Sequence, residues 1–500
     1  MKDRKSLFIT TTQYKNLLPE CLVMAKSFFS EYDWESTLDA IKADVMINVV
    51  ENHFFVRVFE NQEVDYSTNL IGFEGLVLNG AIRKALYLEC SKVADKKLPW
   101  GLLQGIRPTK LVFKIKEQLE GENHSADKEQ HKTIVDYQDE IKGILMSRYM
   151  VSETMSRLAI KVAIHEEPYI PASIQEAVNS FSMYIGIPFC PTRCHYCSFP
   201  STSLDLWNGH IEDYLDALFH ELSTVVPLIL SKKSISTIYI GGGTPTSLTA
   251  SELEKLLSLL HDIIPMHQVK ELTVEAGRPD TITREKLEIL KKYGVDRISI
   301  NPQSLRQGTL DIIGRRHSIE EFYKAYQLAG EVGFKRINMD LILGLPDENL
   351  AIIKETLSIV KELNPSEITV HTLAIKRSSK IHEEMEKYHL PSDEETNDML
   401  KATREALTID GNYEPYYLYR QKNMVGSHEN VGYYRDDEPC IYNIEIMEEV
   451  RPIVAFGAGG VSKILHLDHR LTRTENVKNV TAYIERTDEM IQRKIKEFEL

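Results

Sequence analysis

Between residues 181 and 375 the sequence alternates six times between a short strand-like run and an amphipathic helical stretch, and no other feature limits the fold as much. The expected strands are 181–189, 236–243, 271–277, 297–303, 336–344 and 367–375. Strands that alternate with helices pair in parallel through right-handed crossovers. Because candidate functional residues gather at the C-terminal ends of these strands, we expect the α/β class with a partial (β/α)6 TIM-like barrel. A doubly wound sheet is the alternative.

Three of the six cysteines, Cys190, Cys194 and Cys197, lie in one loop directly after the first expected strand. Such a loop can place three thiolates around one face of a [4Fe–4S] cubane. Cubanes usually have four cysteine ligands, so three would leave one iron open. A structural zinc ion would need a fourth close ligand, for which His195 and Cys440 are poorly placed. The spacing therefore predicts that these three cysteines are the metal ligands of an iron–sulfur cluster.

The C-x3-C-x2-C motif after a first strand resembles the radical S-adenosylmethionine (SAM) superfamily, from about Phe181 to Ala374. The runs Y-I-x-I-P-F-C, G-G-G-T-P-T and D-L-I-x-G-L-P resemble in particular its oxygen-independent coproporphyrinogen III oxidase (coproporphyrinogen dehydrogenase) branch. The PWGLLQGIRPTK segment at 99–110 resembles the long members, which have an additional N-terminal domain. The resemblance implies two cofactors, a [4Fe–4S] cluster and SAM.

The resemblance also implies which residues contact SAM. Gly242, Gly243 and Thr244, at the end of the second strand, correspond to the glycine-rich motif that binds the amino acid part of SAM. Glu275 would place a carboxylate near the sulfonium and the amine; a salt bridge at the rim is the alternative reading. The remaining implied cofactor contacts are Tyr184, Tyr196, Gln303, Arg315, Asp340 and Ala374.

The family reaction that the resemblance implies belongs to haem and porphyrin biosynthesis. It is the oxidative decarboxylation of coproporphyrinogen III to protoporphyrinogen IX by a 5′-deoxyadenosyl radical, with a low-potential electron donor as a further partner. A tetrapyrrole with four carboxylates needs aromatic and basic side chains together, and the stretch after the barrel supplies both. The candidate substrate-binding residues are Tyr417, Arg420, Lys422, Gly457 and Gly459.

Phe199 stands where the demonstrated oxidases have a fourth cysteine, two residues after Cys197. Relatives that transfer haem share this C-x2-C-x-F form. A second hypothesis is therefore a haem carrier or chaperone without turnover, in which the His428 segment or Cys440 would be an axial haem ligand. A third is a radical SAM enzyme that opens or methylates haem.

Charge and composition argue against other classes of protein. A net charge of −15 disfavours nucleic acid as the main partner, because phosphate binding needs clustered Lys and Arg. The sequence contains no stretch that approaches the roughly 20 apolar residues of a membrane-spanning helix, and its N-terminus lacks the apolar core of a secretory signal. We therefore expect no membrane insertion and a cytoplasmic location.

The change of pattern along the chain predicts three parts. Residues 1–175 are expected to form an α+β accessory domain that includes the polar segment 117–140 as an exposed helix or a linker. Residues 176–410 are expected to form the radical SAM barrel. Residues 411–500, which are rich in Tyr, Gly and Arg before a last helical tail, are expected to form a C-terminal subdomain that covers the substrate.

Overall fold

The structure is a computed structural model that describes residues 4–9, 16–29, 32–37, 43–50, 53–59, 61, 64–67, 78–103, 107–122, 132–199, 201–207, 209–376, 378–420, 428–436 and 438–500. These residues form two compact units. The first contains Met1–Glu167 and Leu418–Glu429, and the second contains Pro168–Tyr417 and Asn430–Leu500. Each unit has its own hydrophobic core.

The first unit is an α+β structure, as its sequence pattern predicts. Its strands are β1 (Arg4–Ile9), β2 (Asp33–Ser36), β3 (Val45–Val50), β4 (His53–Val58) and β5 (Val64–Ser67), in the order β2-β1-β3-β4-β5. Its helices are α1 (Leu18–Phe28), α2 (Leu78–Ala94), α3 (Pro108–Glu122), α4 (Gln138–Tyr149) and α5 (Glu153–Glu166). The strand-like run 45–59 forms the antiparallel pair β3 and β4, and the helix-like run 81–94 lies within α2. Part of the polar segment 117–140 lies outside the described residues.

The second unit contains the six parallel strands that the alternation predicts. They are β6 (Ser180–Ile187), β9 (Ser234–Gly242), β10 (Glu271–Val274), β11 (Arg297–Ser299), β12 (Arg336–Leu343) and β13 (Glu367–Thr372). Each pairs in parallel with the next one in the chain. Sequence order and spatial order therefore coincide, which is the topology of a partial barrel rather than of a doubly wound sheet.

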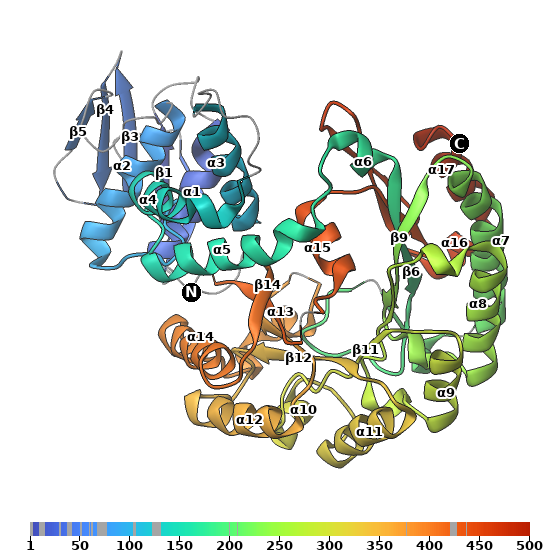
Figure 1. Ribbon diagram of the computed structural model, residues 1–500. Coiled ribbons are helices and arrows are strands. Elements are labelled where there is room, and N and C mark those ends of the chain that lie inside the picture. Colours follow the sequence, from blue (N-terminus) through green and yellow to red (C-terminus); the bar gives the residue numbers. More distant parts are fainter. Residues whose placement is uncertain are drawn as a thin grey trace. The chain divides into compact units, whose positions relative to one another are not determined.

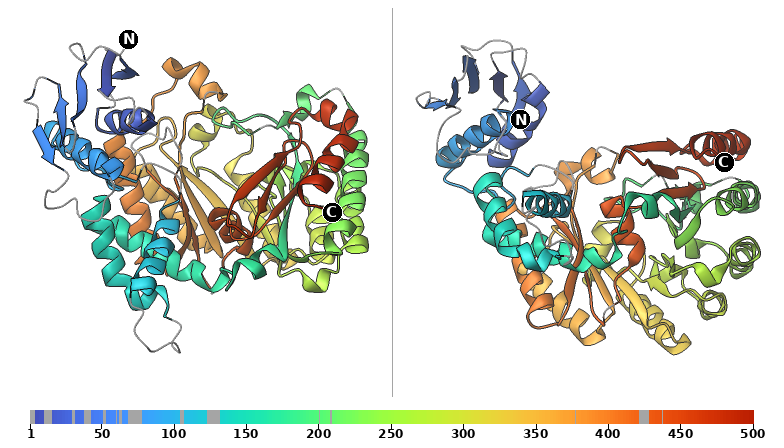
Figure 2. Two further views of the ribbon diagram at one scale, coloured as in Figure 1. Left: turned by 90° about the horizontal axis from the view of Figure 1, so that it is seen from above. Right: turned by 45° about the horizontal axis from the view of Figure 1, so that its top comes forward.

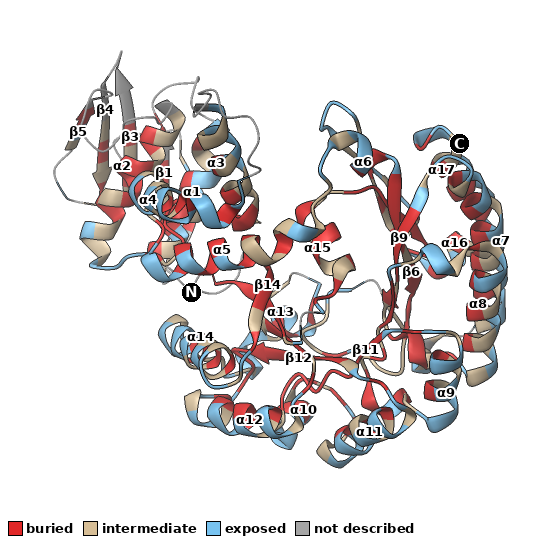
Figure 3. Ribbon diagram, viewed as in Figure 1, coloured by how far each residue is buried: buried red, intermediate tan, exposed pale blue. Residues whose placement is uncertain are grey.

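Helices follow these strands and cover the convex side of the curved sheet (Figures 1 and 2). They are α7 (Ile211–Leu230), α8 (Ala250–Ile263), α9 (Arg284–Lys292), α10 (Gln307–Ile312), α11 (Ile319–Val332), α12 (Leu350–Leu363) and α14 (Asp393–Thr408). The starts of α8 and α11 are encoded locally, because Thr249 with Glu252 and Ser318 with Glu321 form capping boxes. Their buried residues face the sheet and their exposed residues face outward (Figure 3).

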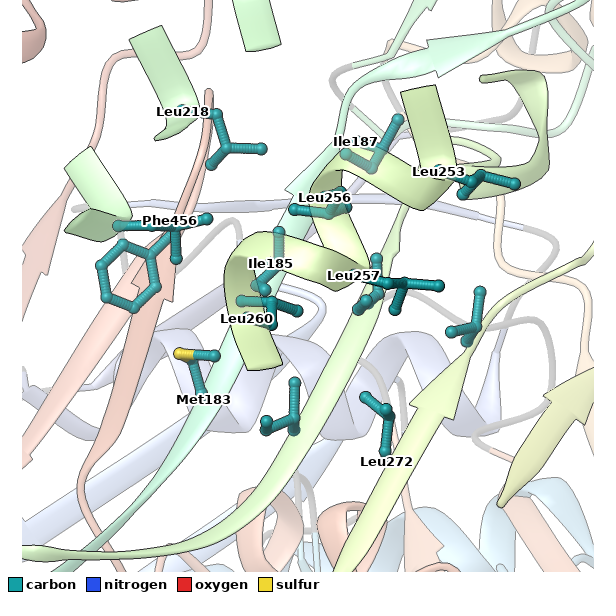
Figure 4. Packing of buried hydrophobic residues seen from close by; sticks show 14 of the residues in the cluster. Met183, Ile185, Ile187, Leu218, Leu253, Leu256, Leu257, Leu260, Leu272 and Phe456 are labelled. Carbon is teal, nitrogen blue, oxygen red and sulfur yellow. The ribbon is translucent and has the colours of Figure 1, made fainter. Parts of the chain in front are cut away.

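The core of this unit lies between the strands and the covering helices. Met183, Ile185 and Ile187 of β6 pack against leucines of α8, among them Leu256 and Leu260 (Figure 4). The alternating pattern of β6 places these three side chains on one face of the sheet, and full burial of such a side chain stabilises the fold by roughly 1.5–3 kcal/mol. This packing keeps the C-terminal ends of β6 and β9 side by side.

The chain after residue 430 extends the same sheet. β15 (Asn430–Tyr434) pairs antiparallel with β13, and β16 (Ile453–Phe456) pairs parallel with β6. Further elements of the C-terminal part are β14 (Glu414–Tyr419), α15 (Ile441–Glu448), β17 (Val461–Leu465), β18 (Leu471–Glu475), α16 (Val480–Glu485) and α17 (Thr487–Glu497). Helix α15 lies on the concave side of the sheet (Figure 1). The division of the chain into accessory, barrel and covering parts stays a prediction.

Within the part of the chain that the structure describes, no helix combines the length and the apolar character needed to cross a membrane.

Candidate functional site

The three cysteines lie where the first barrel strand gives way to a loop. Cys190 ends the short strand β7 (Phe189–Cys190), which pairs with β8 (Thr202–Ser203). The Cys197 backbone N–H donates to the Cys194 carbonyl at 3.1 Å, which closes a turn between the second and third thiols. Cys194 is buried, and the other two cysteines are partly exposed. The loop thus presents three free thiols at the C-terminal end of β6.

His195 fixes this loop to the rest of the barrel. Its backbone N–H donates to the Ile313 carbonyl at 2.8 Å, and its carbonyl accepts from the Ile381 N–H at 3.0 Å. Its ring Nδ1 lies 2.9 Å from the Tyr388 hydroxyl. His195 therefore links the loop to the chain after α10 and to α13 (Lys380–Glu383), which agrees with a structural role rather than metal ligation.

The glycine-rich end of β9 packs directly against the cysteine loop. The Gly243 N–H donates to the Ile187 carbonyl at 2.8 Å, and the Thr244 N–H donates to the Phe189 carbonyl at 2.7 Å. A Cβ on Gly243 would come within 2.5 Å of that Phe189 oxygen and 2.9 Å of Cys190 Sγ, so only glycine fits. The structure thus brings together Cys190 and the predicted SAM motif.

Glu275 follows β10 and reaches the same place from the next strand. Its carboxylate accepts hydrogen bonds from the Tyr239 hydroxyl and from the Gly242 N–H, the latter at 3.2 Å. Burial is the main cause that raises the pKa of Glu275 to about 7. Glu275 is therefore a partly buried carboxylate beside the glycine motif, hydrogen-bonded to a hydroxyl and a backbone N–H, and its role toward SAM stays a prediction.

Arg315 lies close to the second cysteine, and Gln303 lies beside β12. Arg315 donates through Nη2 to the Gly277 and Asn301 carbonyls and through Nη1 to Cys194 Sγ, the last at 3.9 Å. Gln303 is held at a positive φ of 65° while its backbone bridges to β12. Among the described residues, nothing forms a hydrogen bond with Gln303 Oε1 or Arg315 Nε, although both are buried.

The other predicted cofactor contacts line the same end or the interior of the barrel. Asp340 accepts from the side-chain amides of Asn301 and Asn338, both at 2.8 Å. Burial opposes its ionisation, yet hydrogen bonding and charge at His371 keep the pKa of Asp340 below its usual value. The Tyr196 hydroxyl accepts from Arg315 at 3.3 Å. Tyr184 stacks with Tyr239 and Tyr442, and Ala374 follows β13.

Sequence reasoning missed a second buried arginine at the cysteine loop. Arg278 donates to Thr192 and, at 3.9 Å, to Cys194 Sγ, and it forms an ion pair with Asp280. His317 is buried nearby, and its ring nitrogens have no hydrogen-bond partner among the described residues. Burial, reinforced by Arg315 and Arg278, lowers the pKa of His317 to about 3. The only signal in the sequence was the position of Arg278 just past the third strand.

The predicted substrate contacts are spread over both units. Tyr417 is buried beneath β15 and donates to Thr369 Oγ1 at 3.3 Å. Arg420 is buried in the first unit, where it stacks on Trp100 and donates to the Leu103 carbonyl. Lys422 lies outside the described residues. The role of these three residues toward a substrate stays a prediction.

The glycine loop at 457–459 lies at the end of β16, beside the strand that leads to the cysteines. Gly457 and Gly459 have φ values of +87° and +73°. The Gly457 N–H donates to the buried carboxylate of Glu221 at 2.9 Å, and a Cβ on Gly457 would lie 2.5 Å from the Gly186 carbonyl. The position agrees with a loop near the site, and its substrate role stays a prediction.

Cys440 lies at the opposite end of the barrel from the cysteine loop. It is buried and donates to Glu271, the first residue of β10, whereas the loop follows the last residues of β6. A haem at the open end of the barrel therefore receives no axial ligand from Cys440. His428 belongs to the first unit and is buried there.

The donor set fits an anionic cluster next to an amino acid ligand. The Cys194 thiol has two guanidinium groups beside it, and the buried side-chain oxygen of Gln303 accepts no hydrogen bond from a described residue. Among the residues that the structure describes, no three His, Cys, Asp or Glu side chains meet around a single metal ion. A cubane does not require this, because its cysteines bind different irons.

The comparisons with known proteins agree with this arrangement. Residues 184–360 match the family model of the radical SAM superfamily, and the cofactors of the chain are a [4Fe–4S] cluster and SAM. The fold is similar to that of the coproporphyrinogen III oxidase HemN from Escherichia coli, with a TM-score of 0.52 and 24% identity over 64% of this chain and 72% of that one.

Two relatives place the chain more closely. It is 40% identical to the oxygen-independent coproporphyrinogen-III oxidase-like protein HemZ from Bacillus subtilis, over 80% of this chain and 77% of HemZ. It is 30% identical to the heme chaperone HemW of the same organism, over 61% of this chain and 75% of HemW. The chain therefore belongs to the oxygen-independent coproporphyrinogen III oxidase-like family of radical SAM proteins.

Proposed function

We propose that this protein is a radical SAM oxidoreductase that converts coproporphyrinogen III to protoporphyrinogen IX without oxygen. The observation that carries the proposal is the packing of Gly243 and Thr244 against the Cys190 loop, in a chain that is 40% identical to a coproporphyrinogen-III oxidase-like protein. This packing supports the proposal because it holds the glycine motif against the loop that carries Cys190.

The residues divide into two groups by what they would hold. Cys190, Cys194 and Cys197 would hold the cluster, and Gly242, Gly243 and Thr244 would hold the amino acid part of SAM. The other SAM contacts in the proposal are Tyr184, Tyr196, Glu275, Gln303, Arg315, Asp340 and Ala374. When bound, the cluster and SAM supply the one-electron chemistry that starts the reaction.

The chain itself orients the cofactor. Glu275, once ionised, attracts the cationic part of SAM, and Asp340 offers a carboxylate to ribose hydroxyls. The hydrophobic core beneath β6 and β9 holds in place the strands whose ends carry these residues. Each decarboxylation removes one hydrogen atom and carbon dioxide from a propionate and leaves a vinyl group. The remaining electron passes to an acceptor.

The propionates of the substrate need cations near the open end of the barrel. Lys376 and Lys380 follow β13, and Lys380 Nζ lies 3.4 Å from the ring of His195, which places it beside the cysteine loop. We propose these two lysines as propionate contacts. Gly457 and Gly459 would allow the macrocycle to approach the backbone closely.

An anaerobic assay tests this function. The protein is reconstituted with iron and sulfide and mixed with dithionite, SAM and coproporphyrinogen III, and 5′-deoxyadenosine and protoporphyrinogen IX are quantified. We expect both products in proportion, and neither from the Cys194→Ala variant. Formation of 5′-deoxyadenosine without any vinyl product would show that the substrate is wrong while the radical chemistry stands.

Phe199 supports a second candidate, a haem chaperone. It occupies the position two residues after Cys197, and 54% of its surface is exposed, so it offers an apolar face beside the cysteine loop. The heme chaperone HemW is among the relatives of the chain. Titration with haem tests this candidate. A shift of the haem Soret band that saturates at one equivalent and is weakened in Phe199→Ser would favour it over the oxidase.

A further inference from the structure

Arg278 is a buried cation whose guanidinium group reaches a proposed cluster ligand. Its Nη1 lies 3.9 Å from Cys194 Sγ and 3.2 Å from Thr192 Oγ1. On the other side, Nε and Nη2 donate to the two carboxylate oxygens of Asp280 at 2.9 and 2.7 Å. The Arg278 side chain is only 3% exposed. Asp280 thus orients the guanidinium fork so that its remaining N–H groups point to the cysteine loop.

The charge around the three thiols is unequal. Cys194 receives N–H···S contacts from both Arg278 and Arg315, whereas the hydrogen bond described for Cys190 Sγ involves the Thr244 hydroxyl. Arg315 already has a proposed role in binding SAM, but Arg278 has none. Buried charges interact strongly because little solvent screens them. Arg278 therefore acts most directly on Cys194, the thiol it contacts, and its charge also reaches Cys190.

We propose that Arg278, oriented by Asp280, is a positioning residue that acts through Cys194 to raise the reduction potential of the cluster. Reduction adds one negative charge to the cluster, and a buried cation beside a ligand sulfur stabilises that state. Asp280 lies on the far side of the guanidinium group and partly offsets its charge. The inference rests on the proposed cluster ligands.

The experiment is a redox titration of the reconstituted protein without SAM, followed by electron paramagnetic resonance of the reduced cluster. Four variants are compared with the wild type: R278Q, R278K, D280N and R284Q. Arg284 is a matched control, since it is the first residue of α9, just after the same connection, but its side chain is 52% exposed in an ion pair with Glu331. R284Q removes the same unit of charge from a solvated position.

We expect R278Q to reduce the ratio of reduced to oxidised cluster at least tenfold at a fixed potential, which is about 59 mV for one electron. D280N should shift the potential in the opposite direction, because the guanidinium group loses its counter-charge. R278K should give a smaller decrease than R278Q, and R284Q no shift. Opposite signs for R278Q and D280N separate a charge effect from general damage to the loop.

The inference is wrong if R278Q and R284Q have equal potentials, or if R278Q and D280N shift the potential in the same direction. If R278Q does not assemble the cluster, the test rests on the other two variants. In that case the absence of a shift in both D280N and R278K would overturn the inference. A failure of the ligand assignment has a different signature. In that case Cys194→Ala would keep the iron content and the potential of the wild type.

Discussion

At the scale of single residues, Gly243 is where the glycine motif packs against the cysteine loop, so a larger side chain there would disturb both. A methyl group there would overlap the Phe189 carbonyl and Cys190 Sγ, and backbone atoms cannot move aside cheaply. We expect Gly243→Ala to fold but to lose most of its iron after reconstitution, as measured by iron analysis and visible absorbance.

Gly330→Ala is the control for this variant. Gly330 lies in α11, and nothing stands within 4 Å of a Cβ at that position. Alanine should therefore leave the iron content unchanged and stabilise the helix by up to about 1 kcal/mol. Full iron loading of Gly243→Ala would contradict the proposed contact between the glycine motif and the cysteine loop.

Glu275 predicts a pH dependence of SAM binding. Its pKa of about 7 means that it loses its charge as the pH falls through neutrality. When Glu275 is neutral, it no longer attracts the positively charged SAM. We expect the dissociation constant for SAM, measured by calorimetry on the reconstituted protein, to rise as the pH falls from 8 to 6. Glu275→Gln should bind SAM weakly at both pH values.

The same variant should be more stable than the wild type in alkaline solution. The folded-state pKa of Glu275 is raised from its ordinary value of 4.5, so ionisation destabilises the fold as the pH rises through this interval. The glutamine removes a penalty on the order of 3 kcal/mol at pH 8. A less stable Glu275→Gln protein with unchanged SAM affinity would show that the carboxylate serves the fold rather than the cofactor.

The sequence predicts site residues when their spacing carries the signal. The three cysteines and the Gly242–Thr244 motif each lie within one local run, so their juxtaposition follows from parallel strands alone. Arg278 and Tyr442 could not be found in this way. Arg278 is important only because the loop from 84 residues earlier folds back onto it, and Tyr442 reaches Tyr239 only because α15 enters the concave side of the sheet.

At the scale of elements, the six barrel strands were predictable because each is an apolar run between helical stretches. The residues at which these strands end were harder to predict. The predicted strand 271–277 ends as β10 at Val274, and 297–303 ends as β11 at Ser299. Glu275 and Gln303, two of the proposed SAM contacts, follow these strand ends rather than lying within the strands. Strand β16 pairs with β6 from more than 250 residues away in the chain, and no local pattern reports that partner.

A buried ion pair attaches the C-terminal helix α17 to α7. Lys494 Nζ lies 2.6 Å from Glu221 Oε1, and the two side chains are 2% and 0% exposed. Glu221 also accepts hydrogen bonds from Tyr483, Asn476 and the Gly457 backbone. Lys494→Met leaves this carboxylate buried without its counter-charge, so we expect a loss of about 3–5 kcal/mol in the free energy of unfolding in urea.

Lys496→Met removes the same charge from an exposed position of α17 and should change stability by less than about 0.5 kcal/mol. Because the Gly457 N–H is tied to Glu221, Lys494→Met should also raise the hydrogen exchange rate of that amide at denaturant concentrations below unfolding. Equal stability of the two lysine variants would mean that the pair contributes nothing to the attachment of α17.

At the scale of the whole molecule, the two units have separate hydrophobic cores, and all the proposed cluster and SAM contacts lie in the second. A ligand stabilises whatever unfolds together with its site. At SAM concentrations near 100 times the dissociation constant, bound SAM adds about 2.7 kcal/mol to the free energy of unfolding. Amides that exchange only through global unfolding then exchange roughly 100-fold more slowly. We expect that protection in β6 and β9 of the reconstituted protein, and little change in α2 of the first unit. Hydrogen exchange measured by mass spectrometry resolves these segments. Equal protection of α2 and β9 would show that the two units unfold as one.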